Sequence, residues 1–149
     1  MPTADDVIKI ARLFLYVKEA QSVGQNRGLR VESIQHWAGG EFGDSWCAEF
    51  VWMVLDLAYG GHPPFDRMQS CEAIRAMAQD RSWITDTPQP GQLYLYVNSA
   101  GRAHHVGFVT GVDPLTGIAG NTSLDGSSPN GDGVHEHAIA ARVFVQYLA

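Results

Sequence analysis

Hydrophobic residues recur at helical spacing in the first half of the chain, which predicts several helices before any strand. Residues 4–19 carry apolar side chains every three or four positions, and Thr3 with Asp6 three residues later is typical of a capping box. Residues 30–38 predict a second helix, which the two glycines that follow would end. Residues 70–80 predict a further helix of moderate amphipathicity.

The segment 44–58 differs from these helices because it is apolar nearly all round. Such a helix is buried inside a protein rather than laid on its surface. We expect Asp44 or Ser45 to cap it, which places Cys47 in the first turn, where unpaired backbone N–H groups converge. These groups and the helix dipole favour an ionised thiol, so Cys47 is a candidate nucleophile. A cysteine in an apolar helix is also often a small core residue, and the helix alone leaves both interpretations open.

After the Pro-rich and Gly-containing segment 88–91 the apolar and polar residues begin to alternate. Four segments predict strands in this way, namely residues 92–97, 104–112, 118–122 and 142–148. Residues 113–117 predict a tight turn between the second and third of these strands. Helices first and strands afterwards are typical of an α+β fold with a mostly antiparallel sheet. We expect one domain over residues 1–149.

The predicted strand 104–112 carries a second candidate residue. Alternation places His105 on the same face as two glycines and His104 on the opposite face. Glycines in a strand often mark the close approach of another element, so we expect a helix against the His105 face, with His105 near the start of that helix. An ideal hairpin puts Asn121 opposite Val109, on the His105 face but four residues away from it, so a contact between them requires a bulge or slip.

These three side chains are the parts needed for nucleophilic acyl transfer. Cys47 would attack a carbonyl carbon, His105 would take and return the proton, and Asn121 would fix the imidazole tautomer. Backbone N–H groups at the helix start would stabilise the oxyanion. Taken singly, His105 is as compatible with a core histidine, and Asn121 with a turn residue.

Composition then excludes several classes of function. The net charge of −6 and the absence of a Lys/Arg cluster argue against nucleic acid or a membrane surface as partner. Two cysteines are too few for a disulfide framework, so we expect two reduced thiols. His104, His105, His135 and His137 suggest a metal, but adjacent strand residues point to opposite faces. We therefore expect neither a metal nor another cofactor.

The N-terminal sequence MPTADDV has no basic region and no apolar core, and no segment reaches membrane-spanning length. We therefore expect synthesis in the cytoplasm without a signal peptide and without membrane insertion. If the protein acts in the periplasm or cell wall, another route, such as phage lysis or secretion, must deliver it there.

Several short motifs in a fixed order carry a resemblance to a known family. They are WCAEFV at 46–51, PGQLYLY at 90–96, HHVGFVTGV at 104–112, GNTS at 120–123 and GDGV at 131–134. In this order and spacing they resemble the CHAP and NlpC/P60 group of papain-like cysteine peptidases, which includes small phage and bacterial cell-wall hydrolases. The resemblance runs from about Glu19 to the C-terminus.

The resemblance implies a papain-like α+β fold and hydrolysis of an amide bond in peptidoglycan, with peptidoglycan or a muropeptide as partner. The bond is either the N-acetylmuramoyl-L-alanine amide or one within the stem peptide. Carried over, Cys47 is the nucleophile, His105 the base and Asn121 the orienting group. Many relatives have Glu two residues before this Asn, where the chain has Ala119, so the third role rests on Asn121.

Two alternatives stay open. The same fold is compatible with a non-catalytic module that binds muropeptides or forms a structural part of a phage or secretion particle. An amidase or transferase acting on some other amide is the second alternative. An intact pair of Cys47 and His105 favours an enzyme, because a pure binding module needs neither residue.

Overall fold

The computed structural model describes residues 1–128 and 131–148 of the chain. Within these residues four helices precede six strands. The helices are α1 (Ala4–Arg12), α2 (Leu29–Trp37), α3 (Cys47–Ala58) and α4 (Cys71–Asp80). The strands are β1 (Ile84–Thr85), β2 (Leu93–Val97), β3 (Ala103–Val112), β4 (Leu115–Thr122), β5 (Gly133–Ala138) and β6 (Val143–Val145). This order confirms the predicted α+β class.

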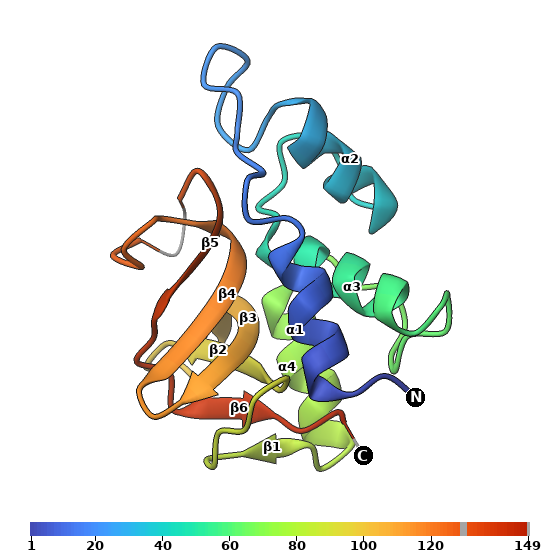
Figure 1. Cartoon of the computed structure of the whole chain (residues 1–149), viewed down its shortest axis with the longest axis vertical. Helices are drawn as coiled ribbons and strands as arrows, with labels where there is room; N and C mark the ends of the chain where they lie inside the picture. Colours follow the sequence, from blue (N-terminus) through green and yellow to red (C-terminus); the bar gives the residue numbers. More distant parts are fainter. Residues whose placement is uncertain (129–130, 149) are drawn as a thin grey trace.

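The strands form one sheet in the order β1-β6-β2-β3-β4-β5, and every neighbouring pair is antiparallel. The helices α1, α3 and α4 lie on one side of this sheet, and α2 lies further out, at the end of the molecule away from the two chain termini (Figure 1). The helix α3 contacts the other three helices as well as β3 and β4. It is therefore the element that joins the helical layer to the sheet.

Burial explains why α3 takes this central place. Nine of its twelve residues are buried, which confirms the prediction of a helix that is apolar nearly all round. The ring of Phe50 packs edge-to-face on Phe14, which follows α1, and on Phe108 of β3, with centroid distances of 6.1 and 6.4 Å. The start of α3 is thereby fixed against the middle of the sheet.

Most of the predicted elements are present, and their ends differ by a few residues. The capping box at the start of α1 is confirmed, because Thr3 and Asp6 each accept a hydrogen bond from the backbone N–H of the other. Two strands escaped prediction. The strand β1 has two residues, and β5 reads GVHEHA, a pattern in which polar side chains obscure the alternation.

The first helix is shorter than predicted, since α1 ends at Arg12 rather than at residue 19. The backbone beyond it turns and then runs beside β5. The N–H of Val134 donates to the carbonyl of Val17 over 3.0 Å, and the N–H of Glu19 donates to the carbonyl of Asp132 over 2.7 Å. These backbone groups are satisfied by the edge of the sheet and cannot also belong to a helix.

The prediction that a helix covers the His105 face of β3 is wrong. A Cβ atom at Gly107 of β3 or Gly117 of β4 would lie 2.5 or 2.6 Å from Cε1 of Tyr94, so these two glycines make room for a tyrosine ring of β2. The helix approaches the opposite face instead. There a Cβ at Gly120 would lie 2.8 Å from Cβ of Phe50 in α3. The glycines do mark close approach, but the partner differs between the two faces of the sheet.

The predicted register of β3 and β4 is also wrong. Val109 lies opposite Gly117 rather than opposite Asn121, because two residues, 113 and 114, connect the paired strand ends. Moving four residues along each strand from this pair reaches His105 on β3 and Asn121 on β4. A bulge between Val109 and Gly111 contributes to this register, and the paired residues end at Phe108 and Ile118, before His105 and Asn121 are reached.

Candidate active site

The candidate nucleophile Cys47 is the first residue of α3, but the cap before it differs from the prediction. Trp46 occupies the N-cap position, and no side chain accepts a hydrogen bond from the start of α3. The Asp44 carboxylate instead accepts from the N–H of Glu41 over 2.9 Å, and Ser45 Oγ accepts from Asn121 over 2.9 Å. The first N–H groups of α3 are therefore left for a ligand, as an oxyanion requires.

A second thiol lies against the first. The Sγ atoms of Cys47 and Cys71 are 3.2 Å apart, and both cysteines are free thiols, as predicted. The hydrogen bond with Cys71, followed by the imidazole of His105, holds the pKa of Cys47 well below its ordinary value, although burial opposes this. The same hydrogen bond and burial raise the pKa of Cys71 well above its ordinary value. Cys47 is therefore the more acidic thiol of the pair.

Sequence reasoning assigned no role to Cys71. The available signal was its position, because the predicted helix 70–80 places Cys71 near a helix start just as 44–58 places Cys47 there. What the sequence does not show is that two helix starts, 24 residues apart, converge on one point.

The candidate base His105 is fully buried on β3, and His104 is exposed, which confirms the predicted alternation. The imidazole of His105 stacks on Tyr96, with ring centroids 5.6 Å apart and planes inclined by 24°. Its Nε2 lies 3.4 Å from the hydroxyl of Tyr94. Its Nδ1 is buried and has no hydrogen-bond partner among the described residues. This leaves Nδ1 as the ring nitrogen that is free to take the proton of the neighbouring thiol.

The third candidate, Asn121, has a left-handed backbone with φ of 54° at the end of β4. Its Nδ2 donates to Ser45 Oγ, two residues before Cys47, and its Oδ1 is buried without a partner in the described chain. The side-chain group found within hydrogen-bonding distance of Nε2 of His105 is the hydroxyl of Tyr94, not the amide of Asn121. Sequence reasoning missed this tyrosine, which alternation places on the same face of the sheet as the histidine.

Hydrogen bonds from two buried side chains, Gln35 and Trp46, fix the segment that leads into α3. Gln35 Nε2 donates to the carbonyls of Asn26 and Asp44 over 2.8 and 2.9 Å. The indole N–H of Trp46 donates to the Glu19 carboxylate over 2.9 Å. The N-terminal residues that carry part of the family resemblance thus hold the backbone just before the candidate nucleophile Cys47.

A buried carboxyl group lies in the first turn of α3. Burial, together with the negative charges of Asp44 and Cys47, raises the pKa of Glu49 to about 8. Both carboxyl oxygens lack a hydrogen-bond partner in the described chain, and a Cβ at Gly40 would collide with one of them. Glu49 is therefore protonated at neutral pH and does not compete with the thiolate for the positive end of the helix dipole.

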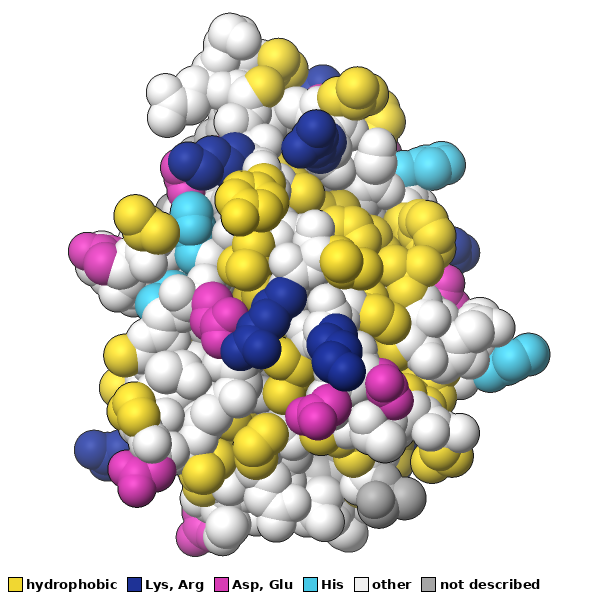
Figure 2. Space-filling view, viewed as in Figure 1, with side chains coloured by type: hydrophobic (Ala, Val, Ile, Leu, Met, Phe, Trp, Pro, Cys, Tyr) yellow, Lys and Arg dark blue, Asp and Glu magenta, His cyan; other side chains and the backbone are white. Residues whose placement is uncertain are grey.

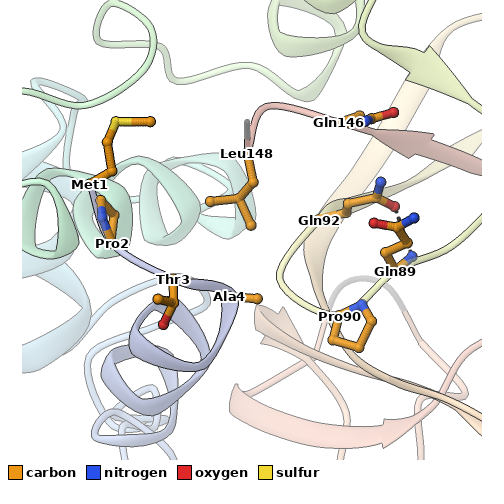
Figure 3. A pocket seen from close by; sticks show the side chains of 9 residues that line it. All are labelled: Met1, Pro2, Thr3, Ala4, Gln89, Pro90, Gln92, Gln146 and Leu148. Carbon is orange, nitrogen blue, oxygen red and sulfur yellow. Dashed lines mark hydrogen bonds between the residues drawn. The ribbon is translucent and has the colours of Figure 1, made fainter.

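Three of the larger cavities of the described chain lie around the helices and the sheet, and neither Cys47 nor Cys71 lines any of them. One of about 430 Å³ is lined by Tyr96 and His104 and so begins one ring away from His105. Another of about 390 Å³ lies between the two chain ends and the segment before β2, and Figure 3 shows that no acidic or basic side chain lines it. The third, of about 360 Å³, is apolar and lies where α1, α2 and α3 meet, on the face where Figure 2 shows hydrophobic side chains gathered.

The described residues include no group of three His, Cys, Asp or Glu side chains placed to hold a metal ion. In residues 1–128 and 131–148, no helix has both the length and the apolar character that a membrane span requires.

A buried thiol at a helix start, set beside an imidazole on an antiparallel sheet, defines the papain-like α+β class and contains the parts of a thiol-dependent hydrolase. The family model of the CHAP domain matches residues 37–121, which is more than half of the chain. The chain belongs to the CHAP family. The matched segment includes Cys47 and His105 and ends at Asn121, so it is shorter than the resemblance first suggested.

CHAP domains form a family of peptidoglycan-hydrolase-type amidases and peptidases, which associates the chain with the cell wall. No curated protein and no solved structure gave a match to the chain.

Proposed function

We propose that the protein hydrolyses an amide bond of peptidoglycan, with Cys47 as the nucleophile and His105 as the general base. The observation that carries the proposal is the placement of the Cys47 thiol, whose pKa is lowered, beside a buried imidazole whose Nδ1 has no other partner in the described chain. The bond is either the N-acetylmuramoyl-L-alanine amide or an amide of the stem peptide. Residues 1–149 act as one catalytic domain in the cell wall or periplasm, and the reaction requires no cofactor.

The proposed reaction proceeds through an acyl-enzyme. The Cys47 thiolate attacks the amide carbonyl carbon, and the developing oxyanion accepts hydrogen bonds from the uncapped N–H groups at the start of α3. The His105 imidazolium gives its proton to the leaving amine as the carbon–nitrogen bond breaks. His105 then removes a proton from water, which attacks the thioester and releases the carboxylic acid together with the Cys47 thiol.

In this proposal the orientation of His105 and Cys47 is divided between Tyr94 and Asn121. The resemblance assigns the orientation of His105 to Asn121, whose buried Oδ1 is an acceptor without a partner among the described residues. The hydroxyl of Tyr94 is the group found at Nε2. A neutral phenol accepts the Nε2–H and leaves Nδ1 as the base, which is the tautomer that the reaction needs. Asn121 meanwhile holds Ser45, and through it the backbone that precedes Cys47.

The test is mass spectrometry of muropeptides after purified peptidoglycan is incubated with reduced protein. We expect the wild-type protein to release fragments that carry one new carboxyl and one new amino terminus, and their masses identify the bond. Cys47→Ala should lower the rate by at least about 10³-fold, because residual stabilisation by the helix start cannot replace the nucleophile. The far-ultraviolet circular dichroism of this variant should match that of the wild type.

Two results would contradict the proposal. Wild-type protein that binds peptidoglycan but releases no fragment would support the non-catalytic alternative. A folded Cys47→Ala variant that hydrolyses at the wild-type rate would remove the nucleophile from the proposal while keeping the activity.

A further inference from the structure

The hydrolytic reaction uses one thiol, yet the site contains two. Cys47 and Cys71 are the first residues of α3 and α4, and their sulfur atoms are 3.2 Å apart. The position of Cys71 is fixed from a second direction, because the neighbouring Glu72 accepts a hydrogen bond from the N–H of Ala103 at the start of β3 over 2.9 Å. The strand that carries His105 therefore also holds the second thiol in place.

We propose that Cys71 is a resolving cysteine, through which hydrogen peroxide reversibly switches the site off as a Cys47–Cys71 disulfide. This inference rests on the proposed function, because the disulfide silences the protein by occupying the proposed nucleophile. The site is then active while both thiols are reduced and silent once peroxide has oxidised them.

The first step consumes one peroxide molecule. The Cys47 thiolate attacks one peroxide oxygen, an S–O bond forms, the O–O bond breaks, and the departing hydroxide takes up a proton to become water. Cys47 is now a sulfenic acid. In the second step Cys71 gives up its proton and its sulfur attacks the sulfur of Cys47, so that an S–S bond forms, the S–O bond breaks and a second water leaves. The two thiols together supply the two electrons that reduce the peroxide.

The geometry favours this sequence over irreversible oxidation. Cys47 is 3% exposed, so a molecule as small as hydrogen peroxide is better suited to reach it than a bulky disulfide. The sulfur of Cys71 lies beside the sulfenic acid as soon as it forms, and the S–S bond requires the two sulfurs to approach by only about 1 Å more. Resolution within the protein therefore precedes attack by a second peroxide.

Reversal needs a reductant, for which the class is a small dithiol. Cys71 is the more exposed of the two cysteines, so a dithiol thiolate attacks its sulfur, the S–S bond breaks and Cys47 leaves as a thiolate. The second thiol of the reductant then releases Cys71 and closes the reductant's own disulfide. Both cysteines of the site are then reduced again, and neither has been permanently modified.

The test treats fully reduced protein with a slight excess of hydrogen peroxide, blocks free thiols with N-ethylmaleimide, and measures intact mass and peptidoglycan hydrolysis. We expect the wild type to lose two hydrogen atoms, to bind no maleimide, and to lose at least about 90% of its activity, and dithiothreitol should restore both thiols and activity. Cys71→Ser removes the resolving thiol. Its Cys47 should gain oxygen under the same treatment, and dithiothreitol should fail to recover the activity lost to sulfinic acid.

The outcomes separate this inference from the proposed function. Reduced protein that hydrolyses peptidoglycan, but whose Cys47 accumulates oxygen while Cys71 stays free, overturns the switch and leaves the function intact. A reversible disulfide in a protein that hydrolyses nothing in either state overturns the function. Because the wild-type mass measurement stands without any variant, a Cys71→Ser protein that fails to fold does not leave the inference untested.

Discussion

The starts of α3 and α4 are alike in sequence and opposite in electrostatics. Each helix begins with a cysteine and has a glutamate in its first turn, Cys47 with Glu49 and Cys71 with Glu72. In α3 the cysteine pKa is lowered and burial raises the glutamate pKa to about 8. In α4 the cysteine pKa is raised, and the hydrogen bond from Arg75 holds the glutamate pKa at about 2.

Neighbouring side chains account for the difference. The start of α4 is capped, since Ser70 Oγ accepts from the N–H of Ala73 over 3.2 Å, and Glu72 is paired with Arg75 over 2.7 Å. The start of α3 has no side-chain cap and faces the buried imidazole of His105. Both cysteines lie at the positive end of a helix dipole, so the dipole cannot explain why their pKa values shift in opposite directions. The hydrogen bond between the two sulfurs is shared by both cysteines, and the imidazole of His105 then lowers the pKa of Cys47 alone.

The largest expected effect follows from removing the imidazole that distinguishes α3. His105→Ala should lower peptidoglycan hydrolysis by about 10²–10⁴-fold, because both activation of the thiol and protonation of the leaving amine are lost. His104→Ala is the matched control, and its rate should stay within about threefold of the wild type, since this side chain is exposed to solvent. A folded His105→Ala variant that keeps the wild-type rate, beside an inactive His104→Ala variant, would move the base by one residue.

A smaller effect should distinguish the two thiols directly. In native reduced protein at pH 7, iodoacetamide should modify Cys47 at least about tenfold faster than Cys71, although Cys71 is the more exposed residue, because the reagent consumes thiolate. Peptide mass spectrometry at timed intervals measures both rates. In denatured protein the two rates should converge. Faster native labelling of Cys71 would mean that exposure outweighs ionisation and that the comparison between the helix starts fails.

The sequence was sufficient to predict those parts of the site that depend on local pattern. An unbroken apolar segment predicts the burial of α3 and the position of Cys47 at its start. Alternation along β3 predicts that His105 is buried and His104 exposed. Each inference concerns residues within one helix or strand, where their separation along the sequence determines which face of the element they occupy.

The remaining parts depend on contacts between elements. The relation of Asn121 to His105 depends on the length of one turn and on a bulge between Val109 and Gly111, which together set the register of β3 and β4. The contact of Tyr94 with the imidazole requires the pairing of β2 with β3, and the approach of Cys71 to Cys47 requires the packing of α4. No periodicity in the sequence encodes these distances, so the sequence could suggest the nucleophile and the base but not their neighbours.

The smallest expected effect concerns the two glutamates, which should respond to pH with opposite signs. The folded-state pKa of Glu49, about 8, is above its ordinary value of 4.5, so the folded protein holds a proton that the unfolded chain has lost between these pH values. Stability from Glu49 is therefore greatest below pH 4.5 and decreases until about pH 8. Glu49→Gln removes this pH-dependent loss of stability. The melting temperature of the variant should equal that of the wild type at pH 5 and exceed it by a few degrees at pH 8.5.

Glu72 provides the matched comparison. Its folded-state pKa of about 2 is below the ordinary value of 4.5, so its contribution is fully present above pH 4.5 and is lost as the pH falls towards 2. Glu72→Gln should therefore lower the melting temperature at pH 7 and at pH 8.5 and have no effect near pH 2. Thermal unfolding of the two variants at pH 8.5 is the decisive measurement, since one should melt above the wild type and the other below it. Shifts of the same sign would show that the two helix starts do not differ in the way their carboxyl groups indicate.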